Sequence, residues 1–215
     1  MSCSQCVGIE LRFDRKKAAQ DLREYRKDGP KGSTRKLLDA VMAGSVSDMT
    51  LLDIGGGVGA IQHELMKAGA SSSINVEASQ AYVEAAKTEA KRQGHADRIS
   101  HFHGDFVDLA SDIPECDIVT LDKVVCCYHD MRSLVEESSA RAKRVYGLVY
   151  YRDHWYARIW TALHNFRNTL QRNPFRQFVH PPEEIDRILR RKGFQKRFHH
   201  EAGVWLTVVY ERSNL

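Results

Sequence analysis

The sequence predicts an α/β fold around a mostly parallel β-sheet that ends in an antiparallel strand pair. Short apolar runs alternate along the chain with longer segments in which apolar residues recur at helical spacing. The first clear run, residues 50–54, leads into Gly55-Gly56-Gly57-Val58-Gly59, which is typical of a strand, a tight turn and a helix start. The last two predicted strands, residues 194–200 and 204–210, have no helix between them, which favours an antiparallel pair.

Length and composition predict one globular domain. The chain has 215 residues, of which 42% are hydrophobic and 28% charged, as in ordinary soluble proteins. The net charge of +4 is modest and no long Lys/Arg run favours a nucleic-acid partner, so an anionic small substrate stays compatible. We find no apolar run of membrane-spanning length and no signal-peptide pattern, and we expect a cytoplasmic protein.

The cysteines predict free thiols and no metal site. Five cysteines without an export signal are typical of a reducing compartment. Cys3 and Cys6 have the spacing of zinc ligands, but a tetrahedral site needs two more ligands and there is no second Cys-x-x-Cys. We therefore expect a mobile N-terminal tail there.

The first 32 residues predict an arm outside the main domain, which spans residues 33–215. Residues 9–27 are highly charged with apolar residues at helical spacing, which predicts one amphipathic helix. The helix should end before Gly29-Pro30, and Ser33 or Thr34 can cap the next one. The arm is either a lid or a helix packed at the edge of the sheet.

The glycine-rich turn is the first candidate binding element. Its glycines allow positive φ and close approach of the backbone to a ligand, and the following helix, predicted to end near Lys67, offers free N–H groups. Gly55-Gly56-Gly57-Val58-Gly59-Ala60 also satisfies the G-x-G-x-x-A form of the dinucleotide fingerprint. The turn therefore predicts a ligand with a nucleoside-like body, its class still open.

The next three strands each place an acid at or just after their carboxyl end. Residues 73–76 lead to Glu77, which suits two ribose hydroxyls. Residues 99–103 precede Gly104-Asp105-Phe106, where the aspartate can accept a hydrogen bond from an adenine amino group. Residues 117–121 are nearly all apolar, as in a strand buried on both faces, and end at Asp122.

Helices and strands continue to alternate in the second half. We expect a helix over 131–143, a strand over 144–150 and an inserted helical segment at about 152–180. The inserted helix carries one apolar stripe, Trp155, Ile159, Leu163, Phe166 and Leu170, which favours core packing over ligand contact. It is also placed to roof an acceptor pocket.

The order of Asp53, the glycine turn, Glu77, Gly104-Asp105-Phe106 and the strand ending at Asp122 resembles the class I S-adenosylmethionine-dependent methyltransferases. The resemblance implies a seven-stranded Rossmann-like sheet with helices on both faces, a reversed C-terminal strand, and S-adenosyl-L-methionine as cofactor. It implies these cofactor-binding residues: Asp53, Gly55, Gly57, Glu77, Gly104, Asp105, Phe106 and Asp122.

The segment after Asp122 supplies the catalytic candidates. Tyr128 and His129 leave the carboxyl end of the fourth strand, where parallel sheets bind ligands, and a neutral imidazole suits a base. Cys126 and Cys127 are either apolar wall residues or reactive thiols. Tyr25, beside the predicted hinge of the arm, is a third catalytic candidate.

A narrower resemblance concerns the acceptor. Residues 125–128, 146–150 and the aromatic helix are similar to the magnesium-protoporphyrin O-methyltransferase group, which methylates a porphyrin propionate. That group has a histidine immediately before the tyrosine, where this chain has Cys127, with His129 on the other side. We expect a small-molecule acceptor, methylated on oxygen, nitrogen or sulfur, most readily a carboxylate or aromatic compound.

Two other classes stay open. A nicotinamide-dependent oxidoreductase shares the glycine fingerprint, although the reversed last strand and the short chain favour the methyltransferase. A methyltransferase-like binding protein without turnover is the other, and the sequence leaves the oligomeric state open.

Overall fold

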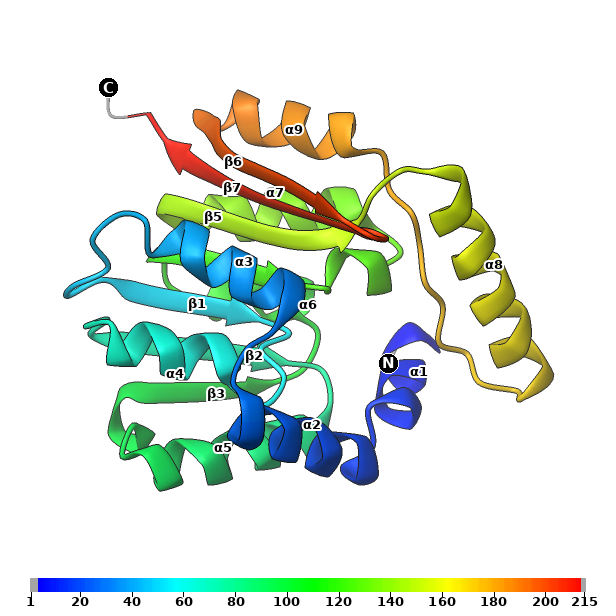
Figure 1. The fold of residues 1–215 in the computed structure, drawn as a ribbon, viewed down its shortest axis with the longest axis horizontal. Helices are drawn as coiled ribbons and strands as arrows, with labels where there is room; N and C mark the ends of the chain where they lie inside the picture. Colours follow the sequence, from blue (N-terminus) through cyan, green and yellow to red (C-terminus); the bar gives the residue numbers. More distant parts are fainter. Residues whose placement is uncertain (1–3, 214–215) are drawn as a thin grey trace.

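The computed structural model describes residues 4–213, except the side chains of Ser4 and Cys6. Its centre is a seven-stranded sheet with the order β3-β2-β1-β4-β5-β7-β6 (Figure 1). The strands are β1 (Thr50–Ile54), β2 (Ser72–Glu77), β3 (Ile99–His103), β4 (Cys116–Asp122), β5 (Ala142–Tyr151), β6 (Phe194–Ala202) and β7 (Trp205–Arg212). β7 is antiparallel to both of its neighbours, β5 and β6, while β1 to β5 pair in parallel. The predicted fold class is confirmed.

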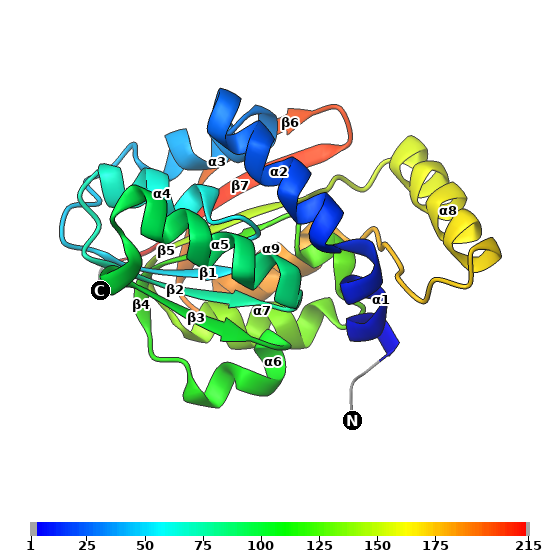
Figure 2. The ribbon, with the colours of Figure 1, turned by 90° about the horizontal axis from the view of Figure 1, so that it is seen from below.

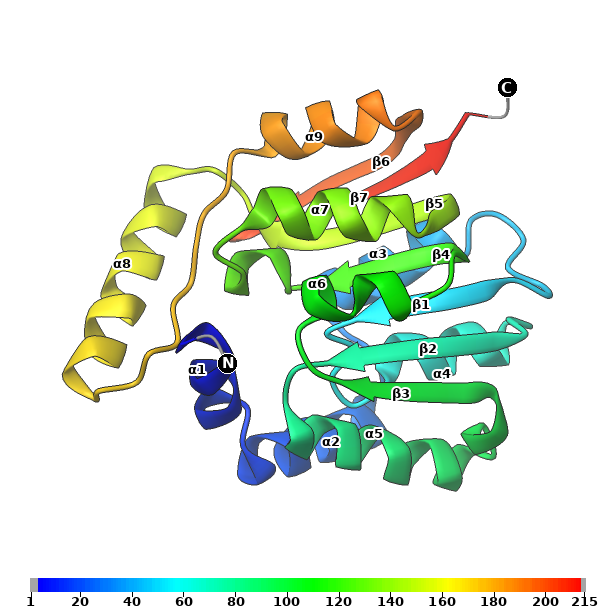
Figure 3. The ribbon, with the colours of Figure 1, turned by 180° about the vertical axis from the view of Figure 1, so that it is seen from behind.

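Helices cover both faces of the sheet because its strands are apolar on both sides. The adjacent residues Leu51 and Leu52 belong to two different cores, one on each face. The helices α3, α4 and α5 lie on one face, and α6, α7 and α9 cover the other (Figures 1 and 3). Their bounds are α3 (Gly32–Val41), α4 (Ala60–Lys67), α5 (Gln80–Gln93), α6 (Phe106–Leu109), α7 (Met131–Ala140) and α9 (Pro182–Arg191), with short 3-10 turns η1 (Ala96–Arg98), η2 (Ala110–Asp112) and η3 (Val125–Cys127).

The N-terminal segment forms two helices where the sequence predicts one. These are α1 (Ser4–Arg12) and α2 (Arg15–Asp28), and Figure 2 shows α2 lying along α5. The break falls at Asp14, whose side chain accepts a hydrogen bond from the Lys17 N–H and so caps α2. Cys3 and the Cys6 side chain lie outside the described residues. The chain is already helical from Ser4, where we expected a tail.

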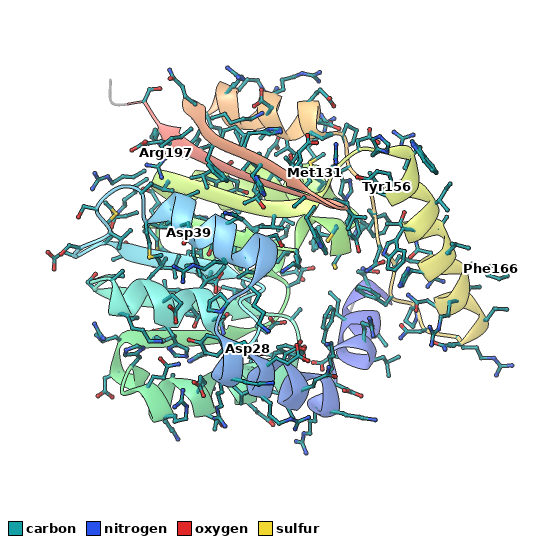
Figure 4. The ribbon with its side chains drawn as sticks, in the orientation of Figure 1. Asp28, Asp39, Met131, Tyr156, Phe166 and Arg197 are labelled. Atoms are coloured by element: carbon teal, nitrogen blue, oxygen red, sulfur yellow. The ribbon has the colours of Figure 1, made fainter. Side chains whose placement is uncertain are left out.

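The long helix α8 (Trp155–Leu170) corrects a second prediction. Its stripe of large apolar residues faces solvent instead of the core, and Phe166 points away from the body of the molecule (Figure 4). Only Ala157 and Thr161 of this helix are buried. Helical spacing shows that the residues share a face, but not what that face contacts.

One charged residue of α5 is buried. The Glu89 side chain is enclosed completely beneath Arg26 of α2 and Arg92. None of the helices among residues 4–213 is long and apolar enough to cross a bilayer.

Candidate functional site

Two adjoining cavities open at the carboxyl ends of the parallel strands. The larger has a volume of about 500 Å³ and the smaller about 300 Å³. Residues at or just after the ends of β1 to β5 line the larger cavity, because parallel strands all end at the same edge. The two cavities share five wall residues: Asp21, Gly55, Gly57, Tyr82 and Asp122.

The glycine turn forms the floor between the cavities. Gly55, Gly57 and Gly59 have φ values of 64°, 57° and 85°, in the left-handed region that glycine adopts without steric cost. Gly56 is needed for a different reason: a Cβ there would lie 2.4 Å from Gln62 Nε2 and 2.6 Å from Asp53 Oδ2. The turn is therefore packed tightly against the core below.

Asp53 is buried beneath this turn and borders the smaller cavity. Thr120 Oγ1 donates to its Oδ1 at 2.7 Å, and Gln62 Nε2 donates to its Oδ2 at 3.0 Å. Burial raises the pKa of the Asp53 carboxyl to about 7, against the two hydrogen bonds, which lower it. Asp53 thus supports the turn from inside the protein.

Glu77 ends β2 and lies in the wall of the larger cavity. Its Oε2 accepts from the Gly57 N–H at 3.1 Å, and its Oε1 accepts from the Ser79 N–H at 2.9 Å. Burial raises the pKa of Glu77, while these backbone donors lower it. The carboxylate joins the glycine turn to the next strand and leaves lone pairs for a ligand.

The three residues after β3 all line the larger cavity. Gly104 has a φ of 148°, and the Asp105 side chain caps α6 by accepting from the Val107 N–H at 3.0 Å. The Tyr128 hydroxyl donates to the same carboxylate, 2.9 Å from Oδ2. Phe106 is buried beside them. The structure therefore brings Tyr128 to the predicted adenine end.

Asp122 lies between the two cavities. Lys123, the next residue, was not predicted from the sequence to be a site residue. Lys123 has a φ of 63°, rare for a residue with a side chain. Its Nζ donates to Thr34 Oγ1 at 2.8 Å and lies 3.4 Å from Asp122 and 5.5 Å from the centre of the Trp205 ring. The position of Lys123 directly after an acid at the end of a strand could have identified it from the sequence. No sequence pattern pointed to Trp205.

The other two catalytic candidates do not line the larger cavity. The His129 ring stacks on Tyr128 with 5.3 Å between centroids and lies outside the cavity's lining residues. Tyr25 borders the smaller cavity, where its hydroxyl donates to Glu64 at 3.2 Å. Burial is the largest cause that raises the Tyr25 pKa. The structure does not bring the three candidates together.

Cys126 and Cys127 both line the larger cavity, and their sulfurs are 3.9 Å apart. Both are free cysteines. The hydrogen bond to Cys127 and burial raise the pKa of the Cys126 thiol, so that thiol stays protonated. This supports a role as an apolar wall.

The N-terminal helices close one side of the larger cavity, a contribution that sequence reasoning located only in general terms. Arg12 at the end of α1 and Phe13, which follows it, both lie in its wall. Gln5 is buried and donates to the Cys127 carbonyl at 2.6 Å and to the Arg176 carbonyl at 2.9 Å. None of the residues of α8 lines this cavity, although Tyr151, Phe175 and Gln177 on either side of it do. The inserted helix is therefore not its roof.

Solved structures with this fold include methyltransferases. One is magnesium protoporphyrin IX methyltransferase from Synechocystis PCC 6803 with bound SAH, at 18% identity and a TM-score of 0.73, covering 97% of this chain and 100% of that one. An O-methyltransferase family protein from Burkholderia thailandensis has 15% identity and a TM-score of 0.71, covering 95% of this chain and 63% of that one. An O-methyltransferase family 2 protein from Planctomyces limnophilus, in complex with apigenin, has 13% identity and a TM-score of 0.66, covering 93% and 62%.

Sequence comparison identifies the family. A search of curated protein sequences finds no match. The family model described as an O-methyltransferase domain matches residues 9–144, which is more than half of the chain. The resemblance to S-adenosylmethionine-dependent methyltransferases, and with it the cofactor prediction, is confirmed at the level of the family. The chain belongs to the O-methyltransferase domain family.

Proposed function

We propose that the protein transfers a methyl group from S-adenosyl-L-methionine to an acidic oxygen of an apolar small molecule, most readily a carboxylate. The distribution of charge over the larger cavity carries this proposal. Glu77 ends β2, and Asp105 lies just after β3, the neighbouring strand in the sheet. The other half of the larger cavity, at β4, β5 and β7, contains Lys123, Tyr151 and Trp205.

The half of the larger cavity that contains Glu77 and Asp105 fits the cofactor. Glu77 is placed to accept from the ribose hydroxyls, and Asp105 with Phe106 and Gly104 to hold the adenine. Gly57 presents an open surface, since a Cβ there would meet nothing closer than 3.7 Å. We assign the methionine part to the smaller cavity, beside Gly55, Asp122 and the buried Asp53.

The half of the larger cavity that contains Lys123 fits an anionic acceptor. Lys123 offers an ammonium group beside the Trp205 ring, and Arg12 lines the same cavity with no acid paired to it among residues 4–213. A carboxylate is already ionised at neutral pH and needs no base, so these cations hold it and the aromatic walls exclude water.

The cofactor supplies a methyl group on a positively charged sulfur, and the protein's residues orient the acceptor oxygen in line with it. Tyr128 holds Asp105 in place, and His129 supports Tyr128 by stacking. Tyr25 acts at the smaller cavity, as part of the arm that covers the methionine part. We therefore treat His129 and Tyr128 as positioning residues.

A porphyrin propionate is the narrower acceptor proposal. It is supported by the similarity to the Synechocystis enzyme and by the apolar cavity with Lys123. The complex of a second neighbour with apigenin makes an aromatic hydroxyl compound the alternative oxygen acceptor. Nitrogen and sulfur acceptors have no such observation in their favour.

Calorimetry with S-adenosylhomocysteine tests the cofactor site. We expect Glu77→Ala to lower the affinity at least ten-fold, about 1.4 kcal/mol, and Glu115→Ala, an exposed acid outside both cavities, to leave it unchanged. Equal affinities in both variants would refute the site. Stabilisation by NADH in place of the sulfonium cofactor would favour the oxidoreductase.

Transfer of a labelled methyl group tests turnover and acceptor class. We expect product with magnesium protoporphyrin or another apolar carboxylate, and Lys123→Met to raise its KM with little change in cofactor affinity. His129→Ala should lower kcat and leave cofactor binding nearly intact. Cofactor binding without product from either carboxylates or aromatic hydroxyl compounds would indicate a binding protein.

A further inference from the structure

The outer face of α8 exposes more large apolar surface than any other helix among residues 4–213. Trp155, Leu163, Phe166 and Leu170 are each between 61% and 69% exposed, and Ile159 and Trp160 about half. Contiguous exposed apolar surface of this kind marks an interaction site. Figure 4 shows Phe166 pointing outward from a helix that stands clear of the sheet.

The charges around this face are positive. Helix α8 contains Arg158 and Arg167 and no acidic residue. Arg158 pairs with Asp153 just before the helix, and Arg167 has no ion pair among the described residues. Tryptophan, leucine and phenylalanine on one side of a helix with arginine beside them are typical of helices that lie in a membrane interface.

A basic groove continues the same surface towards α1 and α2. The groove is lined by four cationic residues, Arg12, Lys16, Lys17 and Arg167. Asp14 is the one acid among its described lining residues. Leu11, 58% exposed, lies at this groove as well. The apolar face of α8 is thus bordered by cations from two parts of the chain that are distant in sequence.

We propose that this face binds an anionic lipid surface, with α8 lying parallel to the bilayer plane. The apolar side chains enter the interface, and Arg167 and Lys16 meet the lipid headgroups. A second copy of the chain is a poorer occupant, because two such faces would bring the groove's arginines and lysines together with only Asp14 of each described groove lining to neutralise them.

The groove also leads to the proposed acceptor site. Arg12, Lys17, Phe175 and Gln177 line both the groove and the larger cavity. An apolar acceptor dissolved in the membrane would therefore reach Lys123 along a wall of aromatic and cationic side chains. This consequence rests on the proposed function, whereas lipid binding does not.

Vesicle flotation tests the proposal. We expect the protein to float with vesicles of equal parts phosphatidylcholine and phosphatidylglycerol, at least ten-fold more strongly than with phosphatidylcholine alone, and less strongly as salt rises. The double variant Leu163→Glu with Phe166→Glu should lose at least ten-fold in lipid affinity. Thr88→Glu with Gln195→Glu adds the same charge at exposed positions outside α8 and should bind like the wild type.

Lys16→Gln with Arg167→Gln should reduce binding to anionic vesicles and leave the Tm unchanged. Absence of flotation with anionic vesicles, or equal binding by the two glutamate double variants, would overturn the proposal. A dimer in sedimentation that Leu163→Glu with Phe166→Glu dissociates, without flotation, would assign the face to self-association instead. Methyl transfer to a soluble acceptor is measured alongside, so that failure of the proposed function is seen separately.

Discussion

At the scale of single residues, the glycines of the turn meet different constraints. Gly56 faces Gln62, Asn75 and Asp53, with no space for a side chain, whereas Gly57 faces the open cavity with a positive φ. Glycine at position 56 allows the close packing beneath the turn, whereas glycine at position 57 leaves space for a ligand.

We expect Gly56→Ala to destabilise the protein by about 2–3 kcal/mol through overpacking. Gly57→Ala should cost only about 1 kcal/mol for its left-handed backbone but weaken S-adenosylhomocysteine binding about ten-fold. Urea unfolding and calorimetry on both variants check this contrast. Loss of binding with intact stability in Gly56→Ala would contradict it.

The buried Asp53 makes stability depend on pH in a particular direction. Its pKa rises from 3.8 to about 7 on folding, so its ionisation opposes folding progressively as the pH increases between these values. Asp53→Asn cannot ionise. Relative to wild type, this variant should gain on the order of 1–4 kcal/mol between pH 4 and pH 8. Urea unfolding at both pH values is the measurement, and a difference that does not vary with pH would refute the burial argument.

The sequence predicted where the cavity acids lie, because each is at or just after the carboxyl end of a strand at the same edge of the sheet. Glu77, Asp105 and Asp122 needed only strand ends to be recognised. Lys123 was missed because its role depends on an unusual backbone angle and on Trp205, which lies far along the chain. The cofactor roles of these residues remain predictions.

At the scale of elements, α2 is fastened to the domain by a buried carboxylate. Arg26 Nε lies 2.8 Å from Glu89 Oε2 across the two helices. Burial alone would raise the pKa of Glu89, but its bonds to Arg92, Gln93 and Arg26 lower it to about 2. A helical pattern could not predict this contact, because the partner helix has to be in place first.

Arg26→Ala should destabilise the protein by about 1–3 kcal/mol at neutral pH, since a buried charge loses a partner. The depressed pKa of Glu89 makes this stabilisation complete above pH 4.5 and progressively lost towards pH 2, so the cost should shrink on acidification. Thermal unfolding measures it, with the exposed Arg23→Ala on the same helix as control. Equal effects of the two substitutions would argue against the anchor.

The inserted helix α8 shows the limit of element prediction from spacing. Its existence was predicted because apolar residues recur at helical intervals over residues 155–170. The prediction that this stripe packs in the core was wrong. Apolar residues recur with a period of 3.6 whether the stripe contacts the rest of the protein or a different surface.

At the scale of the whole molecule, the arm and the cavities form one unit. Residues of α1 and α2 line the larger cavity and residues of α2 line the smaller one, so a ligand in either cavity contacts the arm as well as the sheet. The fold was predictable because alternating strands and helices leave few topologies, whereas the contacts of the arm depend on the assembled sheet.

Bound S-adenosylhomocysteine should therefore slow cleavage by trypsin at Lys27 and Lys31, which flank Gly29-Pro30. Both are exposed, and cleavage there requires local opening of the arm. We expect a rate at least several-fold lower with ligand, measured by mass spectrometry of the fragments. Cleavage at the same rate with saturating ligand would show that the arm does not close over it.

The position of the last strand has a consequence for biosynthesis. β7 occupies the space between β5 and β6, so the sheet has a gap until residues 205–212 arrive. A chain synthesised only as far as β6 lacks this strand, together with the tryptophan that faces Lys123. The wall of the larger cavity at Lys123 is thus completed only once β7 is in place, and loss of β7 would leave β5 and β6 with unpaired edges prone to aggregation.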